Sequence, residues 1–310
     1  MKPAIKTQEY KAANACDHGN STSGRAQNVM SEQLRYCLRL LRFKDWSVQS
    51  GIFLLGAFFL DDLLARSLGF IAGSLVLSCL CLSYGYSLNE YFDELKEKLA
   101  GDPRTSAELF SFIYVLLATA LVLASIISRT TFIVVTLIGV TVWLHSSPPF
   151  RLKRRLFWRL FLNSLGFALF FLAGASLDNH LTTGEMLMGI FIFGLYLPLE
   201  LIHVLAHMEA DRAKGLPTFA LVHGERKTIV LAITILGALI VFSGLLCQLK
   251  FVSLMFAAWS VLHLALLLFA LVASCKRTNN VETYGKLRFQ AKLVCSVYGM
   301  GMLTIFVCKM

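Results

Sequence analysis

The sequence of 310 residues carries little charge for its length: only 15% of it is Asp, Glu, Lys or Arg, while 56% is hydrophobic. A water-soluble domain cannot bury that much apolar surface, whereas a lipid bilayer can solvate it. The eight cysteines contain no Cys-x-x-Cys pair, which argues against both a zinc site and a disulfide framework. We therefore expect an integral membrane protein whose cysteines are ordinary packing thiols.

The N-terminal segment, residues 1–33, lacks the apolar stretch that follows a basic start in a cleaved signal peptide. It is rich in Ser, Asn, Ala and Gly instead, a composition typical of a disordered tail. A transit peptide is a weaker alternative, because Glu9, Asp17 and Glu32 interrupt the basic residues. We expect a disordered tail over 1–33 and one membrane domain over 34–310.

Nine apolar runs follow, each close to the roughly 20 residues that cross a bilayer. They cover about residues 46–64, 68–91, 109–127, 132–144, 160–177, 186–206, 229–246, 252–273 and 293–307. Basic residues at three- or four-residue spacing precede the first run and predict an amphipathic helix on the membrane surface. The sequence thus predicts an all-α, polytopic membrane protein with about nine transmembrane helices.

Lys and Arg residues are concentrated in alternate loops, around 96–104, 151–155, 212–227 and 276–288. The loops between these contain few basic residues. By the positive-inside rule, the basic loops and the N-terminus lie on the cytoplasmic side, and the C-terminus lies outside. The formal net charge of +10 is therefore explained by membrane orientation, and we expect no nucleic-acid partner.

Two polar motifs close the second and the sixth apolar runs. The first polar motif consists of Asn89, Asp93 and Glu97, which recur every four residues. The second polar motif consists of His203, His207 and Asp211 at the same spacing, with Glu209 alongside. Residues at this spacing lie near one another along one side of a helix, and carboxylates inside a membrane usually mark a site. Their placement four helices apart hints at an internal duplication, with coincidence as the alternative.

Carboxylates gathered beside Lys and Arg suit a diphosphate substrate. Mg²⁺ binds a few carboxylates and completes its octahedron with water and phosphate oxygens. Two facing motifs could hold metal ions that bridge one diphosphate and neutralise its charge as it leaves. The surrounding apolar bundle would hold a long hydrocarbon chain and keep water from a carbocation.

Other interpretations of these residues stay open. Asp93 and Glu97 could be flanking charges paired with neighbouring lysines, and His203 could be a packing residue. Two histidines and Asp211 could also bind zinc or iron, although seven histidines are few for a di-iron oxygenase. A transporter would place such groups near helix midpoints, whereas both motifs lie at helix ends. Glu200, inside the sixth run, is a membrane-embedded carboxylate that could face a cavity.

Several segments resemble motifs of the UbiA superfamily of intramembrane prenyltransferases. Asn-x-x-x-Asp-x-x-x-Glu at 89–97, followed by Pro103 and Arg104, is similar to the family's first aspartate-rich motif. HSSPPFRLKRR at 145–155 resembles its basic loop between the fourth and fifth helices. EADRAKGLPTFALVHG at 209–224 resembles the tail of its second aspartate-rich motif. The resemblance covers about residue 34 to the C-terminus and includes the amphipathic entry helix.

The resemblance implies an all-helical ring around a central cavity and a site for Mg²⁺ and an isoprenyl diphosphate. The implied metal ligands are Asn89, Asp93, Glu97, Glu209 and Asp211. The implied diphosphate contacts are Asn89, Lys98, Arg104, Arg151, Lys153 and Lys214, with Lys153 the strongest candidate of the basic loop. Asp93 and Asp211 are the implied catalytic positions, and His207, which departs from the family pattern, is a third catalytic candidate.

The sequence also departs from the family pattern. Glu90 and Glu97 stand where the family often has Asp, and His203 and His207 replace the usual Asn and Asp. Because histidine is a poorer Mg²⁺ ligand, His207 could hydrogen-bond diphosphate or act as a base instead. We expect a Mg²⁺-dependent transferase that moves an isoprenyl group to a lipophilic or aromatic acceptor in the membrane and releases diphosphate. The alternative is a terpene cyclase of the same superfamily.

Overall fold

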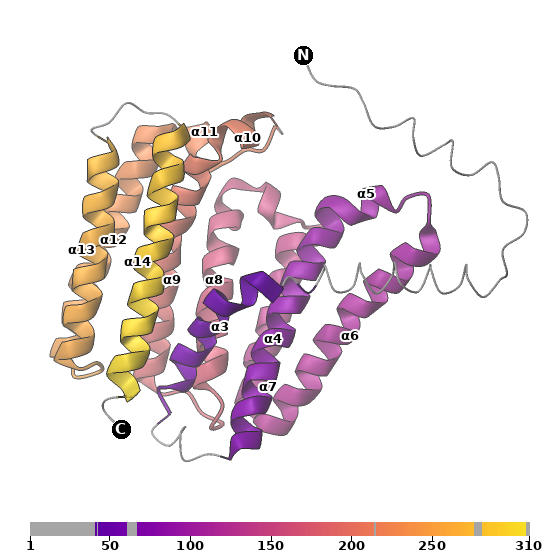
Figure 1. Cartoon of the computed structure of the whole chain (residues 1–310), viewed down its shortest axis with the longest axis horizontal. Helices are drawn as coiled ribbons and strands as arrows, with labels where there is room; N and C mark the ends of the chain where they lie inside the picture. Colours follow the sequence, from indigo (N-terminus) through magenta and orange to yellow (C-terminus); the bar gives the residue numbers. More distant parts are fainter. Residues whose placement is uncertain (1–40, 42, 61–66, 214, 276–280, 308–310) are drawn as a thin grey trace, which may run out of the picture. The chain divides into compact units, whose positions relative to one another are not determined.

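The computed structural model describes residues 41, 43–60, 67–213, 215–275 and 281–307, and all regular structure within these ranges is helical (Figure 1). The tail expected at 1–33 lies outside the described residues. Seven described helices are long and apolar enough to cross a membrane: Leu68–Lys98, Pro103–Ile127, Arg129–Ser146, Leu156–Ala175, Thr183–Ala206, Glu225–Gln248 and Leu254–Ser274. The all-α membrane fold is therefore confirmed.

Two further helices, α3 (Phe43–Ala57) and α14 (Val281–Val307), fall on the first and ninth predicted runs. Helix α3 has 15 residues, fewer than a perpendicular span needs. Helix α14 has 27 residues, and its first half carries charged residues such as Lys286 and Arg288. The predicted count of nine spanning helices therefore stays a prediction.

Side-chain caps set where several helices begin. Helix α4 (Leu68–Glu90) begins after Ser67, whose hydroxyl accepts a hydrogen bond from the Phe70 amide. Helix α6 (Pro103–Ile127) begins six residues before the predicted apolar run, because Asp102 caps it and Pro103 suits the first turn. Ser128 caps α7 (Arg129–Ser146), and a capping box formed by Thr182 and Glu185 starts α9 (Thr183–Ala206).

The remaining elements complete the path of the chain. A π-helical turn, η2 (Tyr91–Leu95), and the short α5 (Lys96–Lys98) continue α4, and a 3₁₀ turn, η3 (Leu152–Arg154), leads into α8 (Leu156–Ala175). The short helices α10 (Met208–Ala213) and α11 (Phe219–His223) connect α9 to α12 (Glu225–Gln248), and α13 (Leu254–Cys275) precedes α14.

Neighbouring helices along the chain pack together into two groups. Helix α4 packs against α6 and α7, whereas α9 packs against α12 and α14, and α13 lies between α12 and α14. Helix α8 contacts both α7 and α9, and α3 contacts α4, α8 and α14, so these two helices join the groups (Figure 1). Two buried apolar clusters form the interior, one centred on α9, α12, α13 and α14, the other on α3, α4, α6, α7 and α8.

Helices α3 and α8 cross at matching Phe-Leu-x-Gly-Ala segments, residues 53–57 and 171–175. A Cβ added to Gly56 would lie 2.0 Å from the Phe171 carbonyl oxygen, and one added to Gly174 would lie 1.9 Å from the Phe53 carbonyl oxygen. The contact is therefore reciprocal, and only glycine lets the two backbones approach this closely.

The same interval of 118 residues that separates Phe53 from Phe171 also separates Asn89 from His207 and Asp93 from Asp211. One spacing thus relates both the helix crossing and the two polar motifs. This agreement supports the internal duplication that the motif placement suggested, and it makes coincidence a poor explanation.

Candidate active site

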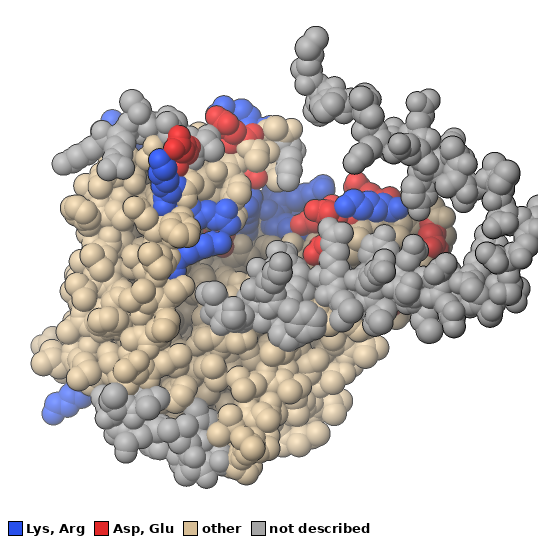
Figure 2. Space-filling view, in the orientation of Figure 1, with Lys and Arg blue, Asp and Glu red and all other residues tan. Residues whose placement is uncertain are grey.

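A cavity of about 800 Å³ lies between the two helix groups. Helices α4, α7, α8 and α9 form its walls, and the segments at 93–94, 151–154 and 211–216 line one end, which we call the mouth. Acidic and basic side chains gather at the end of the molecule that carries α5 and α10, while most of the visible sides are uncharged (Figures 1 and 2). The cavity thus joins a charged mouth to the apolar interior of the bundle.

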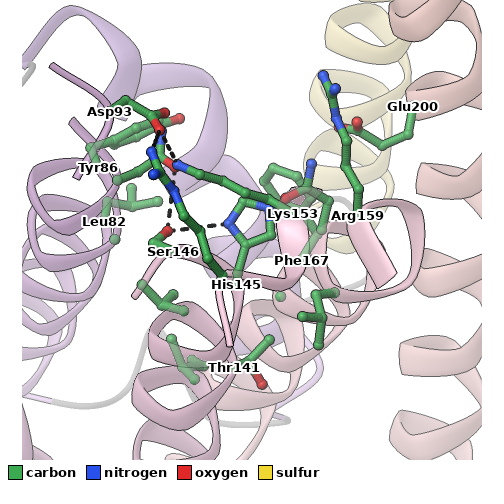
Figure 3. A pocket seen from close by; sticks show the side chains of 18 of the residues that line it. Leu82, Tyr86, Asp93, Thr141, His145, Ser146, Lys153, Arg159, Phe167 and Glu200 are labelled. Carbon is green, nitrogen blue, oxygen red and sulfur yellow. Dashed lines mark hydrogen bonds and ion pairs between the residues drawn. The ribbon is translucent and has the colours of Figure 1, made fainter. Parts of the chain in front are cut away.

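Lys153 holds the centre of the mouth (Figure 3). Its Nζ donates to Asn89 Oδ1 at 2.6 Å and lies 2.5 Å from Asp93 Oδ1. Arg151 adds a second cation, with Nη2 3.0 Å from Asp93 Oδ1 and 2.8 Å from the Phe92 carbonyl oxygen. The structure therefore brings together four of the residues predicted from the sequence: Asn89, Asp93, Arg151 and Lys153.

Burial determines the chemistry of Lys153. Its side chain is only 13% exposed, and this loss of hydration lowers the pKa of the Lys153 ammonium, whereas the Asp93 carboxylate acts in the opposite direction. A partly dehydrated cation attracts an anion more strongly than a solvated one does. The mouth is thus suited to an anionic group.

Two local features of the backbone shape the mouth. Arg151 has a φ of +38°, a left-handed conformation that costs a non-glycine residue energy and often occurs at functional sites. The π-helical turn η2 surrounds Asp93 and interrupts the α-helical register. Within this turn Glu94 also lines the cavity, while Glu97, beyond the turn, is exposed and lies outside the lining. The predicted metal-binding role of Glu97 stays a prediction.

The second polar motif lies across the cavity and is surrounded by cations. Asp211 is largely buried, and its Oδ2 is 3.6 Å from Arg159 Nη1. His207 Nε2 contacts Arg288 Nη1 on α14, and the His203 ring packs 4.6 Å from the His207 ring. Glu209 is exposed and does not line the cavity. The structure therefore brings Asp211 and His203 to the cavity, while His207 does not line it and packs against His203.

Two other predicted diphosphate contacts, Lys98 and Arg104, do not line the cavity. Lys98 pairs with Glu94 at 2.9 Å and Arg104 with Glu108 at 3.0 Å, both on the exposed surface. Lys214 lies outside the described residues. These three roles stay predictions.

Among the described residues, no three His, Cys, Asp or Glu side chains form a group able to hold a metal ion. The first motif nevertheless fits a hard cation, because Asn89 Oδ1 and Asp93 Oδ1 converge on a single cationic atom, Lys153 Nζ. Mg²⁺ typically takes few protein oxygens and leaves the remaining positions to water and phosphate. Two converging oxygens at the mouth of a polar cavity meet that requirement.

Sequence reasoning missed several polar residues of the cavity. His145 places Nδ1 3.2 Å from Ser146 Oγ, and Ser146 donates to Asn89 Oδ1 at 3.3 Å. The other nitrogen, His145 Nε2, is buried and has no hydrogen-bond partner. Arg159 and Asn163 line the α8 wall at i, i+4 spacing. The signal that could have identified Arg159 and Asn163 is the face of α8 on which they lie, one turn apart in an otherwise apolar helix.

The lining changes character with depth. On α8 the cavity-facing residues progress along the helix from Arg159 and Asn163 to Gly166, Phe167 and Phe170. Along η2 and α4 they progress in the opposite chain direction from Asp93 and Asn89 through Tyr86, whose hydroxyl is hydrogen-bonded to Gln49, to Leu82 and Cys81. The cavity therefore has a charged mouth, a polar middle and an apolar floor, a shape suited to an amphiphile with an anionic head.

Fold and cavity together define an integral, multi-pass membrane protein whose internal cavity has a charged mouth and an apolar floor. A family model described as the UbiA prenyltransferase family matches residues 50–293. The chain therefore belongs to the UbiA prenyltransferase family. Comparison with the curated proteins finds none that matches this chain.

Solved structures share the fold at low sequence identity. A digeranylgeranylglyceryl phosphate synthase is 17% identical, with a TM-score of 0.72 over 88% of this chain and 98% of its own. A UbiA homologue from Archaeoglobus fulgidus bound to GPP and Mg²⁺ is 16% identical, and the same homologue bound to DMAPP and Mg²⁺ is 15% identical. Both give a TM-score of 0.67 over 87% of this chain and 99% of theirs. These likenesses concern the fold.

Proposed function

We propose that this protein is a Mg²⁺-dependent intramembrane prenyltransferase that moves an isoprenyl group from its diphosphate to a lipophilic or aromatic acceptor and releases diphosphate. The observation that carries the proposal is the convergence of the Asn89 and Asp93 oxygens on one cation position at the mouth of an apolar-floored cavity. The ligands seen in the Archaeoglobus fulgidus homologue, an isoprenyl diphosphate with Mg²⁺, are of the class that this cavity fits.

Asn89 and Asp93 would hold Mg²⁺, and Asp211 is the residue of the second motif placed to face it across the cavity. The bound ion would neutralise the charge of the diphosphate as the allylic bond ionises. Lys153, Arg151 and Arg159 line the same space and bind diphosphate oxygens directly. The predicted contributions of Glu97, Glu209, Lys98, Arg104 and Lys214 rest on the family resemblance alone.

The apolar part of the cavity has two tasks. Leu82, Ile138, Phe167 and Phe170 line it and bury the isoprenyl chain, which the hydrophobic effect favours. They also exclude water, which would otherwise capture the allylic cation as an alcohol. The depth of this region, set by the length of the helices, limits the chain length of the donor.

The testing experiment measures diphosphate release by detergent-purified protein from geranyl, farnesyl and geranylgeranyl diphosphates, first with Mg²⁺ and then with EDTA. We expect Mg²⁺-dependent release from at least one donor, and its loss in Asp93→Asn, because this change removes a ligand charge while keeping the side-chain shape. Glu108→Gln, which neutralises an exposed carboxylate outside the cavity, is the matched control and should retain wild-type activity.

The products distinguish the outcomes. Prenylated acceptor supports the transferase, whereas a terpene hydrocarbon or cyclic alcohol formed without acceptor identifies a cyclase. Absence of release from every donor, or full activity of Asp93→Asn, contradicts the proposed function.

A further inference from the structure

Glu200 is a carboxylate of the cavity wall that binding of the diphosphate leaves unused. It lies on α9, six residues before the helix ends at Ala206, and lines the cavity below the mouth. Six residues of helix correspond to about 9 Å of depth. Glu200 therefore sits in the polar middle of the cavity, below the level at which the Asn89 and Asp93 oxygens converge.

The surroundings of Glu200 accommodate its charge. Asn163 donates a hydrogen bond to the carboxylate, and Arg159 and Arg288 supply nearby positive charge. Figure 3 shows Glu200 and Arg159 close together on one side of the pocket, with Asp93 and Tyr86 on the other. One turn deeper on α9, the Tyr196 ring stacks on Phe167 at 3.9 Å, where the apolar floor begins. A polar group at Glu200 thus has an apolar surface directly beneath it.

The internal duplication makes Glu200 exceptional. The interval of 118 residues that relates Asp93 to Asp211 relates Leu82 to Glu200, and both Leu82 and Glu200 line the cavity. At these two equivalent positions, one wall of the cavity therefore carries an apolar residue and the other wall a carboxylate. A half-buried carboxylate inside the helix bundle costs free energy without contributing to the apolar packing that Leu82 provides, so a chemical task explains its presence better than folding does.

Prenyl transfer to a hydroxyl requires a group that takes up the hydroxyl proton. The allylic carbon–oxygen bond breaks and its electron pair leaves with the diphosphate. The hydroxyl oxygen of the acceptor then forms the new carbon–oxygen bond and must lose its proton. With the diphosphate at the mouth and the chain on the floor, the allylic carbon lies in the polar middle of the cavity, at the depth of Glu200.

We infer that Glu200, oriented by Asn163, binds the hydroxyl group of a lipophilic acceptor and takes its proton as the new carbon–oxygen bond forms. This inference rests on the proposed function, because it presupposes that the donor is ionised at the mouth. The acceptor class is a hydroxyl-bearing lipophile whose apolar part lies against Phe167, which lines the cavity and is backed by the Tyr196 ring.

The test separates donor ionisation from transfer in the full-length, detergent-purified protein. The donor is whichever isoprenyl diphosphate gives the most Mg²⁺-dependent release, and the acceptor probes are 1-decanol and 4-octylphenol, each compared with its methyl ether. In Glu200→Gln, which keeps the shape of the side chain but cannot take a proton, we expect ether formation to fall about 100-fold or more. Diphosphate release without acceptor should remain within about twofold of wild type.

Two further variants complete the design. Glu200→Asp keeps the carboxylate and should retain measurable transfer, which a purely structural role of the longer side chain does not predict. Asn163→Ala should raise the KM of the hydroxyl acceptor while leaving diphosphate release unchanged, because Asn163 orients Glu200 without touching the donor. Glu108→Gln again serves as the surface control.

Each outcome decides between the proposals. Three results overturn the assignment of Glu200. The first is wild-type transfer in Glu200→Gln, and the second is an equal loss of donor ionisation and transfer in that variant. The third is a wild-type protein that ionises the donor but prenylates neither hydroxyl probe. In all three cases the donor reaction persists in the wild type, so the proposed function survives. Failure of the wild type to release diphosphate is the separate result that removes the proposed function itself.

Discussion

At the scale of single residues, Lys153 is the cation on which the first motif converges. Lys153→Met should raise the KM for an isoprenyl diphosphate about 10- to 100-fold, since a hydrogen bond to a charged group contributes about 1.5–3 kcal/mol. The effect on kcat should be smaller, because Mg²⁺ and Arg151 would still bind the diphosphate. Steady-state kinetics over a range of donor concentration measures both constants.

Lys286→Met is the control for this change. Lys286 lies on α14 and pairs with Glu282 on the surface, where its side chain is 69% exposed. Surface ion pairs contribute little to stability, so this variant should match the wild type in KM and in thermal unfolding. An unchanged KM in Lys153→Met would show that the ammonium serves the fold of the mouth and does not bind substrate.

The residues of the mouth could be predicted from the sequence better than those of the middle. Asn89 and Asp93 end an apolar run, and Lys153 lies in a basic loop of recognisable pattern, so local sequence indicated both. Arg159 and Asn163 lie on the cavity face of α8 only because α8 packs between α7 and α9. That orientation is a tertiary property, and periodicity alone does not determine which helix faces surround a cavity.

At the scale of elements, the crossing of α3 and α8 holds the two helix groups together. Gly174→Ala would place a methyl group 1.9 Å from the Phe53 carbonyl oxygen, so the helices would have to separate. We expect a loss of about 1–3 kcal/mol or more, as in other overpacked interiors. Thermal unfolding in detergent, followed with a thiol-reactive fluorophore that detects exposed cysteines, measures the change.

Gly237→Ala on α12 is the matched control, because a Cβ added to Gly237 meets nothing within 4 Å. This variant should be neutral or slightly stabilising, since alanine favours helix more than glycine does. Gly56→Ala should resemble Gly174→Ala, and the double variant should lose less than the two single losses together, because the first change already separates the helices. Additive losses would show that the two contacts are independent.

The elements also show where helical periodicity stops being reliable. The boundaries of α4, α7 and α9 follow capping residues that the sequence displays, and the apolar runs located these helices correctly. The π-helical turn at Tyr91–Leu95 has no comparable sequence signature, and the four-residue spacing assumed a continuous α-helix through it. For this reason the structure brings Glu94 to the cavity lining in place of Glu97.

At the scale of the whole molecule, the duplicated halves have diverged in charge. Asp93 and Asp211 occupy equivalent positions, and each faces a basic residue, Lys153 of the turn η3 and Arg159 of α8 respectively. The first half keeps the oxygen ligand Asn89, whereas the second half has His207 there, in contact with Arg288. The two equivalent halves therefore form chemically different walls of the cavity. The wall of the first half is suited to a metal ion, and the wall of the second half is rich in cations.

The orientation of the bundle in the membrane follows from which end carries the mouth. Helix α8 begins beside the mouth at Leu156 and ends at Ala175, so the loop at 176–182 lies at the opposite end of the bundle. The positive-inside rule predicts that the basic mouth faces the cytoplasm. The two exposed residues Ala100, near the mouth, and His180, in the opposite loop, are suitable sites for a test.

We expect Ala100→Cys to react with a membrane-impermeant maleimide only from the cytoplasmic face, and His180→Cys only from the other face. The experiment uses sealed vesicles of known orientation and a background in which the eight native cysteines are replaced. Each variant should first be shown to retain diphosphate release, so that labelling reports the native fold. Labelling of both sites from one face would contradict the membrane-spanning arrangement of α8. Labelling with the two faces exchanged would keep the fold and invert the orientation, so that the donor would have to reach the mouth from the side opposite the cytoplasm.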